Sequence, residues 1–441
     1  MSVAIGAAVA GAAPRHGSLT RERQIRRIAA EAYVYGYSVL AEKRVIDVFP
    51  PNTLINVTRL ATPAERLVPA PNVDTVYTVA RLVLGGGSVI IHVPAEHGRY
   101  YVLQLLDAYT NTFGYIGRRV TGGGAGNFAL TGPGWRGRIP AGVRRIRAPT
   151  PTVWLLGRTF VNGPADLPAV NAIQHQYAVS TLPGDVRLPS VFLPQSTLMP
   201  PPFPTGLAYL DALDAAMAQD PPPRSDGELL RRLASVGIAP GRVVSREHLG
   251  ATTLSALTAG LRDGQSEILA YARRLKLTSE RRHNGWVIPP PATGDYGQNF
   301  LLRAYVAMVA LGANTPAEAI YPLAFVDRDL APLTGAHRYV LHFAPGELPP
   351  VNAFWSLTMY DQNLFLVPNP IDRYAIGDRT AGRHRNRDGS LDILLQHSPP
   401  RRRANWLPAP AGPFVLALRL YQPKPPVLEG RWRLPTITRV G

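Results

Sequence analysis

The chain has 441 residues, 46% of them apolar, and a net charge of +17 from 47 Lys and Arg against 30 Asp and Glu. This length exceeds what one hydrophobic core usually serves, so we expect at least two domains. The absence of cysteine excludes disulfides, thiolate nucleophiles and Cys-ligated metals. The 40 Gly and 44 Pro residues indicate many turns and favour a mainly β fold.

The first residues combine an apolar stretch, 3–13, with small residues but lack a basic start. We interpret residues 1–19 as a flexible leader or remnant signal segment, which leaves the compartment open between cytoplasm and export. Helical spacing over residues 21–49 then predicts a helix with Thr20 as its N-cap. Three alternating tyrosines of this helix, Tyr33, Tyr35 and Tyr37, are expected to pack it onto a sheet. No later run is long and apolar enough to predict a membrane span, so we expect a soluble protein.

Short β-like runs follow, separated by Gly and Pro, and are typical of antiparallel sandwich or barrel structure. They cover residues 75–84, 88–93, 100–106 and 153–160. Helical periodicity then predicts helices over residues 207–217, 228–235, 246–277 and 298–311. The predicted parts are therefore a leader (1–19), a helix plus a first β-sandwich domain (20–165), a helical, proline-rich connecting region (166–315) and a second β-sandwich domain (316–441).

The C-terminal part repeats the outline of the N-terminal part. SVIIHVP around His92 resembles YVLHFAP around His342, and YYVLQLLD ending at Asp107 resembles FWSLTMYD ending at Asp361. The spacing agrees as well, because Gly117 and Arg158 are 41 residues apart while Gly377 and Arg419 are 42 apart. Such a repeat predicts two sandwiches of similar topology.

Several motifs of the chain resemble a bacterial family built from two paired modules, domain of unknown function 1254 and domain of unknown function 1214. The first module is similar at residues 32–37, 71–77 and 98–107, and the second at residues 312–314, 319–321, 354–361, 369–379 and 386–392. The resemblance implies two tandem jelly-roll-like antiparallel β-sandwich domains with an intervening helical segment, often in homo-oligomers. It implies no particular reaction.

Three carboxylates are candidates for acid or base catalysis. Asp74 lies in a turn with Asn72 and before Tyr77, while Asp107 and Asp361 end repeated strands. Two carboxylates about 5–10 Å apart are the arrangement that glycosidases use. The alternative is that all three hold turns by bonding nearby backbone groups.

Candidate ligand-binding residues combine planar donors with aromatic rings. They are Asn72, Tyr77, Arg99, Tyr101, Trp355, Tyr360 and Arg373. Arginine binds carboxylate, sulfate or phosphate groups well, but it also forms internal ion pairs. The aromatic residues could stack on a sugar or fill the sandwich cores. The ten scattered histidines show no metal-ligand spacing, so we expect no metal or cofactor.

We predict a hydrolase or lyase that acts on a small polar or carbohydrate-like ligand, with Asp74, Asp107 and Asp361 as its acid and base groups. The alternative is a non-catalytic ligand-binding or oligomeric assembly protein, because no sharp catalytic motif occurs. The expected partners are a small-molecule or glycan-like ligand and further copies of the chain. Nucleic acid is disfavoured, since the run Arg401–Arg403 lacks interleaved aromatic residues. The charge of +17 leaves association with anionic surfaces open.

Overall fold

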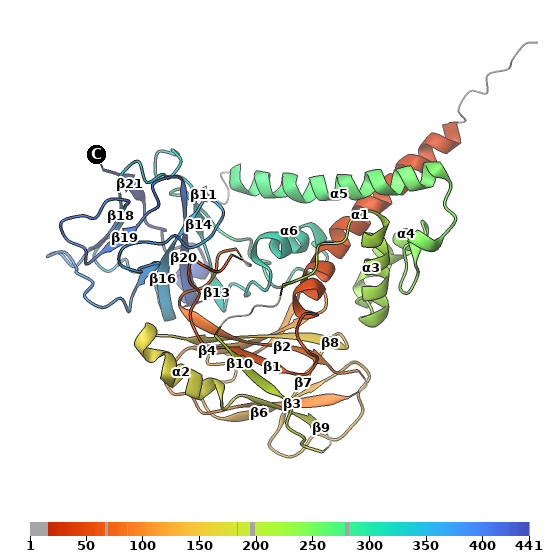
Figure 1. Cartoon of the computed structure of the whole chain (residues 1–441), viewed down its shortest axis with the longest axis horizontal. Helices are drawn as coiled ribbons and strands as arrows, with labels where there is room; N and C mark the ends of the chain where they lie inside the picture. The colour runs from red at the N-terminus through yellow and green to blue at the C-terminus, as the bar shows by residue number, and fades with distance from the viewer. Residues whose placement is uncertain are drawn as a thin grey trace, which may run out of the picture.

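A computed structural model describes residues 16–66, 69–85, 87–182, 184–194, 199–277 and 282–440. It contains two β-sandwiches and a layer of helices (Figure 1). Strands make up 28% of the chain and helices 26%, so the expected mainly β composition is not confirmed. The reason is that Gly and Pro gather in the connections and leave room for two long helices.

The first sandwich, here called the first module, pairs a six-stranded with a four-stranded sheet. The six-stranded sheet has the order β10 (Ser190–Leu193), β1 (Leu54–Val57), β2 (Thr75–Val83), β8 (Thr152–Phe160), β4 (Tyr101–Asp107) and β5 (Thr112–Gly117). The four-stranded sheet has the order β7 (Arg144–Arg147), β6 (Gly126–Thr131), β3 (Ser88–Val93) and β9 (Ala178–Leu182). Their facing side chains, such as Leu105, Leu130 and Leu155, form one core. Strands β9 and β10 carry this module beyond residue 165.

The second sandwich, the second module, has the same construction. Its larger sheet has the order β11 (Arg282–His283), β12 (Trp286–Val287), β14 (Leu323–Ala324), β20 (Phe414–Pro423), β16 (Val351–Asp361) and β17 (Ala375–Gly377), with β13 (Ala319–Ile320) also paired to β20. The smaller sheet has the order β19 (Trp406–Pro408), β18 (Leu391–Gln396), β15 (Tyr339–Phe343) and β21 (Ile437–Arg439). A short helix, α7 (Pro425–Leu428), follows β20.

The repeat predicted from the sequence is present in the strand registers. Val102 lies opposite both Gly117 and Arg158 in the first module, and Ser356 lies opposite both Gly377 and Arg419 in the second. In both modules the edge strand of the smaller sheet, β7 or β19, runs parallel to the strand before it. The two modules therefore share the strand order of their smaller sheets and of β2-β8-β4-β5 with β14-β20-β16-β17. The far edge of the larger sheet differs, because β10 runs parallel to β1 while β11 runs antiparallel to β12.

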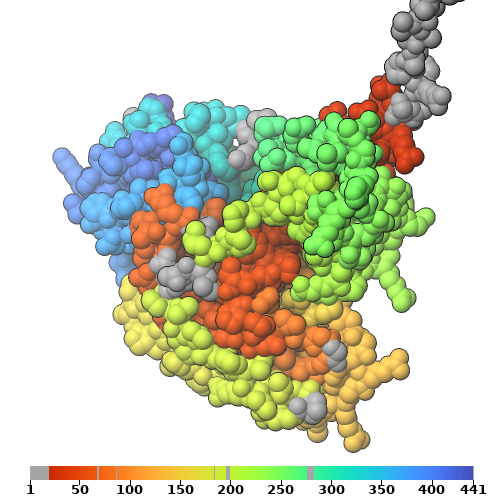
Figure 2. Space-filling model, turned by 45° about the vertical axis from the view of Figure 1, so that its right-hand side comes forward, coloured from red at the N-terminus to blue at the C-terminus, as the bar shows by residue number. Residues whose placement is uncertain are grey.

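The helices form a layer beside the first module (Figures 1 and 2). They are α1 (His16–Ile46), α3 (Leu207–Gln219), α4 (Gly227–Ala234), α5 (Ala251–Leu277) and α6 (Phe300–Ala310), while α2 (Leu167–Gln174) lies against the first module. The predicted helices are confirmed, except that α1 begins before Thr20, which is thus no N-cap. None of the helices in the described part of the chain is long and apolar enough to cross a membrane.

Helix α1 packs mainly on other helices rather than on a sheet. Tyr33 stacks on Tyr209 of α3, with ring centroids 4.6 Å apart, and Tyr35 meets Phe300 of α6 edge-on at 5.1 Å. The tyrosines therefore hold the helical layer together, contrary to the sheet packing expected from the sequence. The alternating pattern could not show this, because it identifies a buried face and not its partner.

Candidate functional site

The outer faces of the two larger sheets meet, and a buried polar layer lies between them. We call these side chains the inter-module layer. Aromatic residues of both modules border it, since Tyr100 of the first module meets Tyr421 of the second at 5.2 Å and Tyr421 stacks on Phe354 at 4.1 Å. Polar groups in such a place must find partners, because water cannot reach them.

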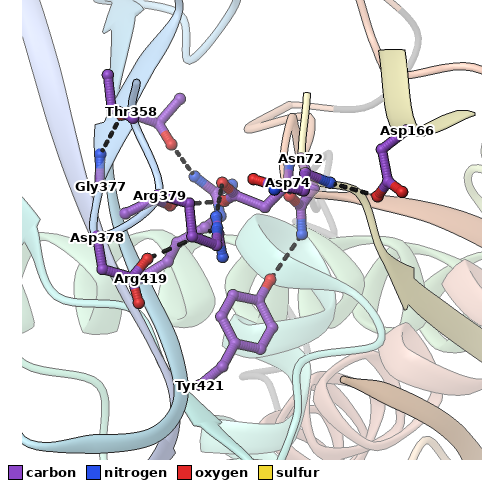
Figure 3. Close-up of polar contacts among 12 residues, drawn as sticks. Asn72, Asp74, Asp166, Thr358, Gly377, Asp378, Arg379, Arg419 and Tyr421 are labelled. Atoms are coloured by element: carbon purple, nitrogen blue, oxygen red, sulfur yellow. Dashed lines mark hydrogen bonds and ion pairs between the residues drawn. The ribbon is translucent and has the colours of Figure 1, made fainter. Parts of the chain in front are cut away.

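Asp74 lies at the centre of this layer (Figure 3). The Oδ1 atom of Asn72 accepts a hydrogen bond from the backbone N–H of Asp74 at 2.7 Å, which fixes the turn before β2. From this turn the carboxylate reaches the second module. Ser356 donates to its Oδ2 at 2.5 Å, and Arg379 donates to its Oδ1 at 3.3 Å.

Two further predicted residues join Asp74 in the layer. The amide of Asn72 donates to the Tyr421 hydroxyl at 2.6 Å, and the Tyr360 hydroxyl donates to the carbonyl of Pro71 at 2.7 Å. Burial raises the pKa of Tyr360 to about 12, although Arg419 opposes the shift. Tyr360 is therefore a neutral hydrogen-bonding group near neutral pH.

Two equivalent arginines, Arg158 and Arg419, are buried in the layer and form no ion pair with the described residues. Arg419 donates to the Thr358 hydroxyl at 2.7 Å and to the carbonyl of Ala70 at 3.0 Å. Arg158 donates to the side chain of Gln104 at 2.7 Å and to the carbonyl of Gly312 at 2.8 Å. Neutral oxygens thus solvate both charges.

The contacts across the boundary are reciprocal. Arg379 follows Gly377 by two residues and pairs with Asp74 before β2. Arg119 follows the equivalent Gly117 by two residues and pairs with Glu318 before β13, at 2.6 Å. The segment before β2 of the first module therefore contacts the outer face of the second module, and the segment before β13 of the second module contacts the outer face of the first. We call this arrangement the reciprocal clasp.

Asp107 and Asp361 do not join Asp74. The Oδ1 of Asp107 accepts hydrogen bonds from the N–H groups of residues 109 and 111, and the Oδ1 of Asp361 accepts them from residues 363 and 365, all at 2.9 Å. Each carboxylate thus shapes its own hairpin turn, as the structural alternative expected. Asp361 also accepts from Arg66 of the first module at 3.3 Å, and neither carboxylate shares a hydrogen-bond partner with Asp74 among the described residues.

Most of the predicted binding residues lie elsewhere. The guanidinium of Arg99 pairs with Asp166, and that of Arg373 donates to the carbonyls of Arg403 and Trp406, both at 2.8 Å. Tyr101 and Trp355 are buried in the cores of their own modules, and half-buried Tyr77 lies beside Arg158. Asn72, Asp74 and Tyr360 are therefore the predicted site residues that form hydrogen bonds in the inter-module layer, and Tyr77 borders it beside Arg158.

The predicted catalytic and binding residues did not include several members of the layer. They are Ser356, Arg419, Tyr421, Glu318 and the pair Arg119 and Arg379. A signal was available, because Arg119 and Arg379 follow equivalent glycines at the same distance and Arg419 is the repeat partner of Arg158. What the repeat could not reveal is that each partner lies in the opposite module.

The chemistry open to this layer is limited. Ser356 is 1% exposed and Asp74 is 5% exposed, so neither is accessible to a substrate in this conformation. In the described ranges, no three His, Asp or Glu side chains gather into a group that could hold a metal ion.

A shallow, open groove lies in the helical layer. It has a volume of about 240 Å³ and lies among α1, α4, α5 and α6. Val34, Leu229, Phe300 and Leu301 form an apolar floor, and Glu31, Arg232, Glu267, Gln298 and Asn299 form a polar rim.

A second, water-sized cavity of about 20 Å³ lies between α1 and α3, beside Glu42. Glu42 is 1% exposed and neither of its carboxyl oxygens has a hydrogen-bond partner. Burial, reinforced by Asp107 and Asp220, raises its pKa well above the ordinary value, and the nearby backbone of Thr110 offsets only part of this shift. Glu42 is therefore a buried acid that favours its neutral form.

Two family models match the chain. "Protein of unknown function (DUF1254)" matches residues 51–181 and "Protein of unknown function (DUF1214)" matches residues 318–425. The crystal structure of the VPA0106 protein from Vibrio parahaemolyticus is similar over 95% of this chain and 100% of that chain, with 23% identity and a TM-score of 0.71, which shows a shared fold. An uncharacterised protein from Burkholderia cenocepacia aligns over 96% and 94% of the two chains, with 13% identity and a TM-score of 0.45. No curated protein matches.

Proposed function

The chain belongs to the family that pairs the DUF1254 and DUF1214 modules, and on this premise we propose that it is a non-catalytic binding protein for a small polar ligand. In this proposal the reciprocal clasp locks the two modules together. The ligand binds in the groove of the helical layer.

The observation that carries the proposal is that the polar residues of the inter-module layer bind one another. Asp74 already accepts from Ser356 and Arg379, and Asn72 already donates to Tyr421. An acid or base catalyst needs a proton exchange with substrate, which a buried and fully engaged carboxylate does not offer. This supports a structural role for the layer, and in the proposal the ligand binds outside it.

The groove has a mixed lining of four apolar and five polar side chains, which suits a small polar ligand better than an apolar one. Phe300 offers an aromatic surface and Glu267 a carboxylate, while the amides of Gln298 and Asn299 each keep part of their hydrogen-bonding capacity beside their bonds to Ser225 and Leu302. Glu267 is exposed and forms no ion pair within the described ranges. At about 240 Å³ the groove is smaller than sites for drug-sized molecules, which favours a ligand such as one sugar unit.

Isothermal titration with glucose, galactose, N-acetylglucosamine and glucuronic acid tests the proposal. We expect at least one to bind with a Kd of roughly 1 mM, as the contact efficiency of so small a ligand allows. Glu267→Gln should weaken that binding about tenfold through loss of a charge-assisted hydrogen bond. Leu301→Trp should abolish it by filling the groove.

Glu347→Gln, a change at an exposed carboxylate in the second module, is the matched control and should leave binding unchanged. Failure of all four sugars to bind would refute the proposal for this ligand class. If the affinity is unchanged in both groove variants but is lower in folded Asp74→Asn protein, the inter-module layer is the binding site instead.

The hydrolase or lyase predicted from the sequence stays a second candidate. Its support is the 2.5 Å hydrogen bond between Ser356 and Asp74, a hydroxyl held by a carboxylate. Hydrolysis of aryl glycosides and aryl esters by the wild type, abolished by Ser356→Ala, would establish it. We also infer jelly-roll-like modules and a homo-oligomer from the family resemblance, and sedimentation velocity tests the latter.

A further inference from the structure

Part of the first module is unusually basic. Between Asp107 and Asp166 the chain has no acidic residue and eight arginines. Three of these have other environments, since Arg158 is buried in the inter-module layer, Arg119 pairs with Glu318 and Arg118 donates to the carbonyl of Gly98. Five remain to be explained.

These five arginines lie together on the edge strand β7 and on the connection that leads to it. They are Arg136, Arg138, Arg144, Arg145 and Arg147, and all are exposed. Trp135 lies among them and is half-buried. Figure 1 shows this four-stranded sheet at the end of the molecule away from α5. We call this surface the arginine edge.

None of the five forms an ion pair with the described residues, although exposure does not prevent pairing in this protein. Arg26 pairs with Asp263 and Arg242 with Glu247, and all four side chains are at least 31% exposed. The arginine edge therefore keeps its charges available for an outside partner.

Two guanidinium groups of the edge are held in place by aromatic rings. Arg144 lies 4.5 Å from the ring centroid of Phe128, and Arg145 lies 5.0 Å from that of Trp135. Arg145 also donates to the Thr131 hydroxyl at 3.1 Å. Charges that are fixed in this way lose less conformational entropy when they bind a partner.

Charged residues on an edge strand also guard against pairing with a second sheet. That role accounts for arginines on β7 itself. It does not account for Arg136 and Arg138, because these precede the strand and lie on a connection with no edge to protect.

From the arginine edge we infer a binding site for an anionic polysaccharide that carries carboxylate or sulfate groups. Arginine forks bind such groups in pairs of parallel hydrogen bonds. A membrane fits less well, because no large apolar side chain between residues 126 and 147 is exposed to anchor in it. Single-stranded nucleic acid fits less well, because one half-buried tryptophan is no platform for successive bases.

The second module repeats the feature. Its connection between β18 and β19 is equivalent to the one before β7 and carries Arg401, Arg402 and Arg403, all exposed. Each module of the chain thus carries one exposed basic connection before the edge strand of its smaller sheet. The site is separate from the helical groove and goes beyond the proposed small-ligand function.

Binding of labelled polygalacturonate by fluorescence anisotropy at 50 and 200 mM NaCl tests the inference. The test variant combines Arg136→Gln, Arg138→Gln and Arg147→Gln, whose side chains form no hydrogen bond with the described residues. The matched control combines Arg224→Gln, Arg231→Gln and Arg246→Gln, three exposed arginines of the helical region. A second variant, Arg136→Glu with Arg138→Glu, leaves β7 intact.

We expect the wild type to bind less tightly at the higher salt concentration, the test variant to lose about tenfold in affinity and the control less than twofold. Equal losses in test and control would overturn the inference in favour of net charge alone. So would tighter binding to a 20-nucleotide oligo-dT strand or to phosphatidylglycerol vesicles than to polygalacturonate. If the test variant binds polygalacturonate as tightly as the wild type but aggregates, the arginines serve to prevent edge-to-edge pairing of β7 rather than to bind a polysaccharide.

Discussion

Arg379 of the second module lies over the rings of Phe160 and Phe354, at 3.9 and 4.1 Å from their centroids, and reaches Asp74 of the first module. Burial lowers the pKa of Arg379, and Asp74 opposes this shift. The pair is thus one of the two charged contacts of the reciprocal clasp, and its loss should lower the stability of both modules.

Asp74→Asn should lower the free energy of unfolding by about 1–3 kcal/mol, because it removes one of the two carboxylates that face the mostly buried Arg379 and leaves only Asp378, at 3.6 Å. Urea denaturation followed by tryptophan fluorescence measures the change. The control Glu429→Gln removes the partner of Arg431 in an exposed pair and should cost less than about 1 kcal/mol. Equal effects of the two substitutions would show that the clasp adds no stability.

Glu42→Gln should stabilise the protein more at pH 8 than at pH 5. The pKa of Glu42 is raised in the folded state by burial, and then by Asp107 and Asp220. As pH rises, the unfolded chain therefore loses this proton before the folded protein does. The contribution of Glu42 to the free energy of unfolding is complete below its pKa in the unfolded chain, and it is lost as pH rises through its higher pKa in the folded protein. Glutamine keeps the shape of the neutral acid and removes this loss.

Melting temperatures across pH 5 to 8 measure that difference. Asp214 provides a second case, because burial raises its pKa to about 7. Its contribution falls as pH rises from its ordinary range, about 4, to about 7, so Asp214→Asn should show the same sign. Glu347→Gln at an exposed site should show no pH-dependent gain. A gain for Glu42→Gln that is the same at pH 5 and pH 8 would argue against the buried-acid assignment.

Gly260→Ala should destabilise the protein, although the same change usually stabilises a helix by about 1 kcal/mol. A Cβ atom at Gly260 would lie 2.2 Å from the carbonyl oxygen of Arg26, so α1 and α5 would have to move apart. We expect a cost of about 1–3 kcal/mol, as for other overpacked sites.

Gly227→Ala is the matched control for this prediction, because nothing lies within 4 Å of its added Cβ atom. It should be neutral or slightly stabilising. Thermal unfolding of both variants measures the contrast, and a stabilising Gly260→Ala would show that the two helices are not held in close contact.

The repeated segments predicted much of the fold because strand alternation and turn residues are local properties. The pattern around Gly117 and Arg158 recurs around Gly377 and Arg419, and the registers of β4 and β16 match it residue for residue. The same reasoning found the turn roles of Asp107 and Asp361 as an alternative, since an Asp that bonds the backbone two residues later needs no distant partner.

The candidate site was only partly predictable. Asn72, Asp74 and Tyr360 were singled out one by one, yet each bonds a partner in the other module that lies between 282 and 349 residues away along the chain. Arg99 and Arg373 were equally plausible binders from their residue type, but one pairs with Asp166 and the other with backbone carbonyls. Residue type alone did not separate these cases.

The sequence by itself determined the two modules, the strand order they share and the helices between them. The reason is that hydrophobic periodicity, the positions of Gly and Pro and the internal repeat depend on residues that are close together along the chain. Only the tertiary structure decided that the segment before β2 crosses to the second module while the segment before β13 crosses to the first. That exchange depends on burying two sheet faces against each other, and the charges of Asp74, Arg379, Glu318 and Arg119 acquire partners only when this burial removes them from water.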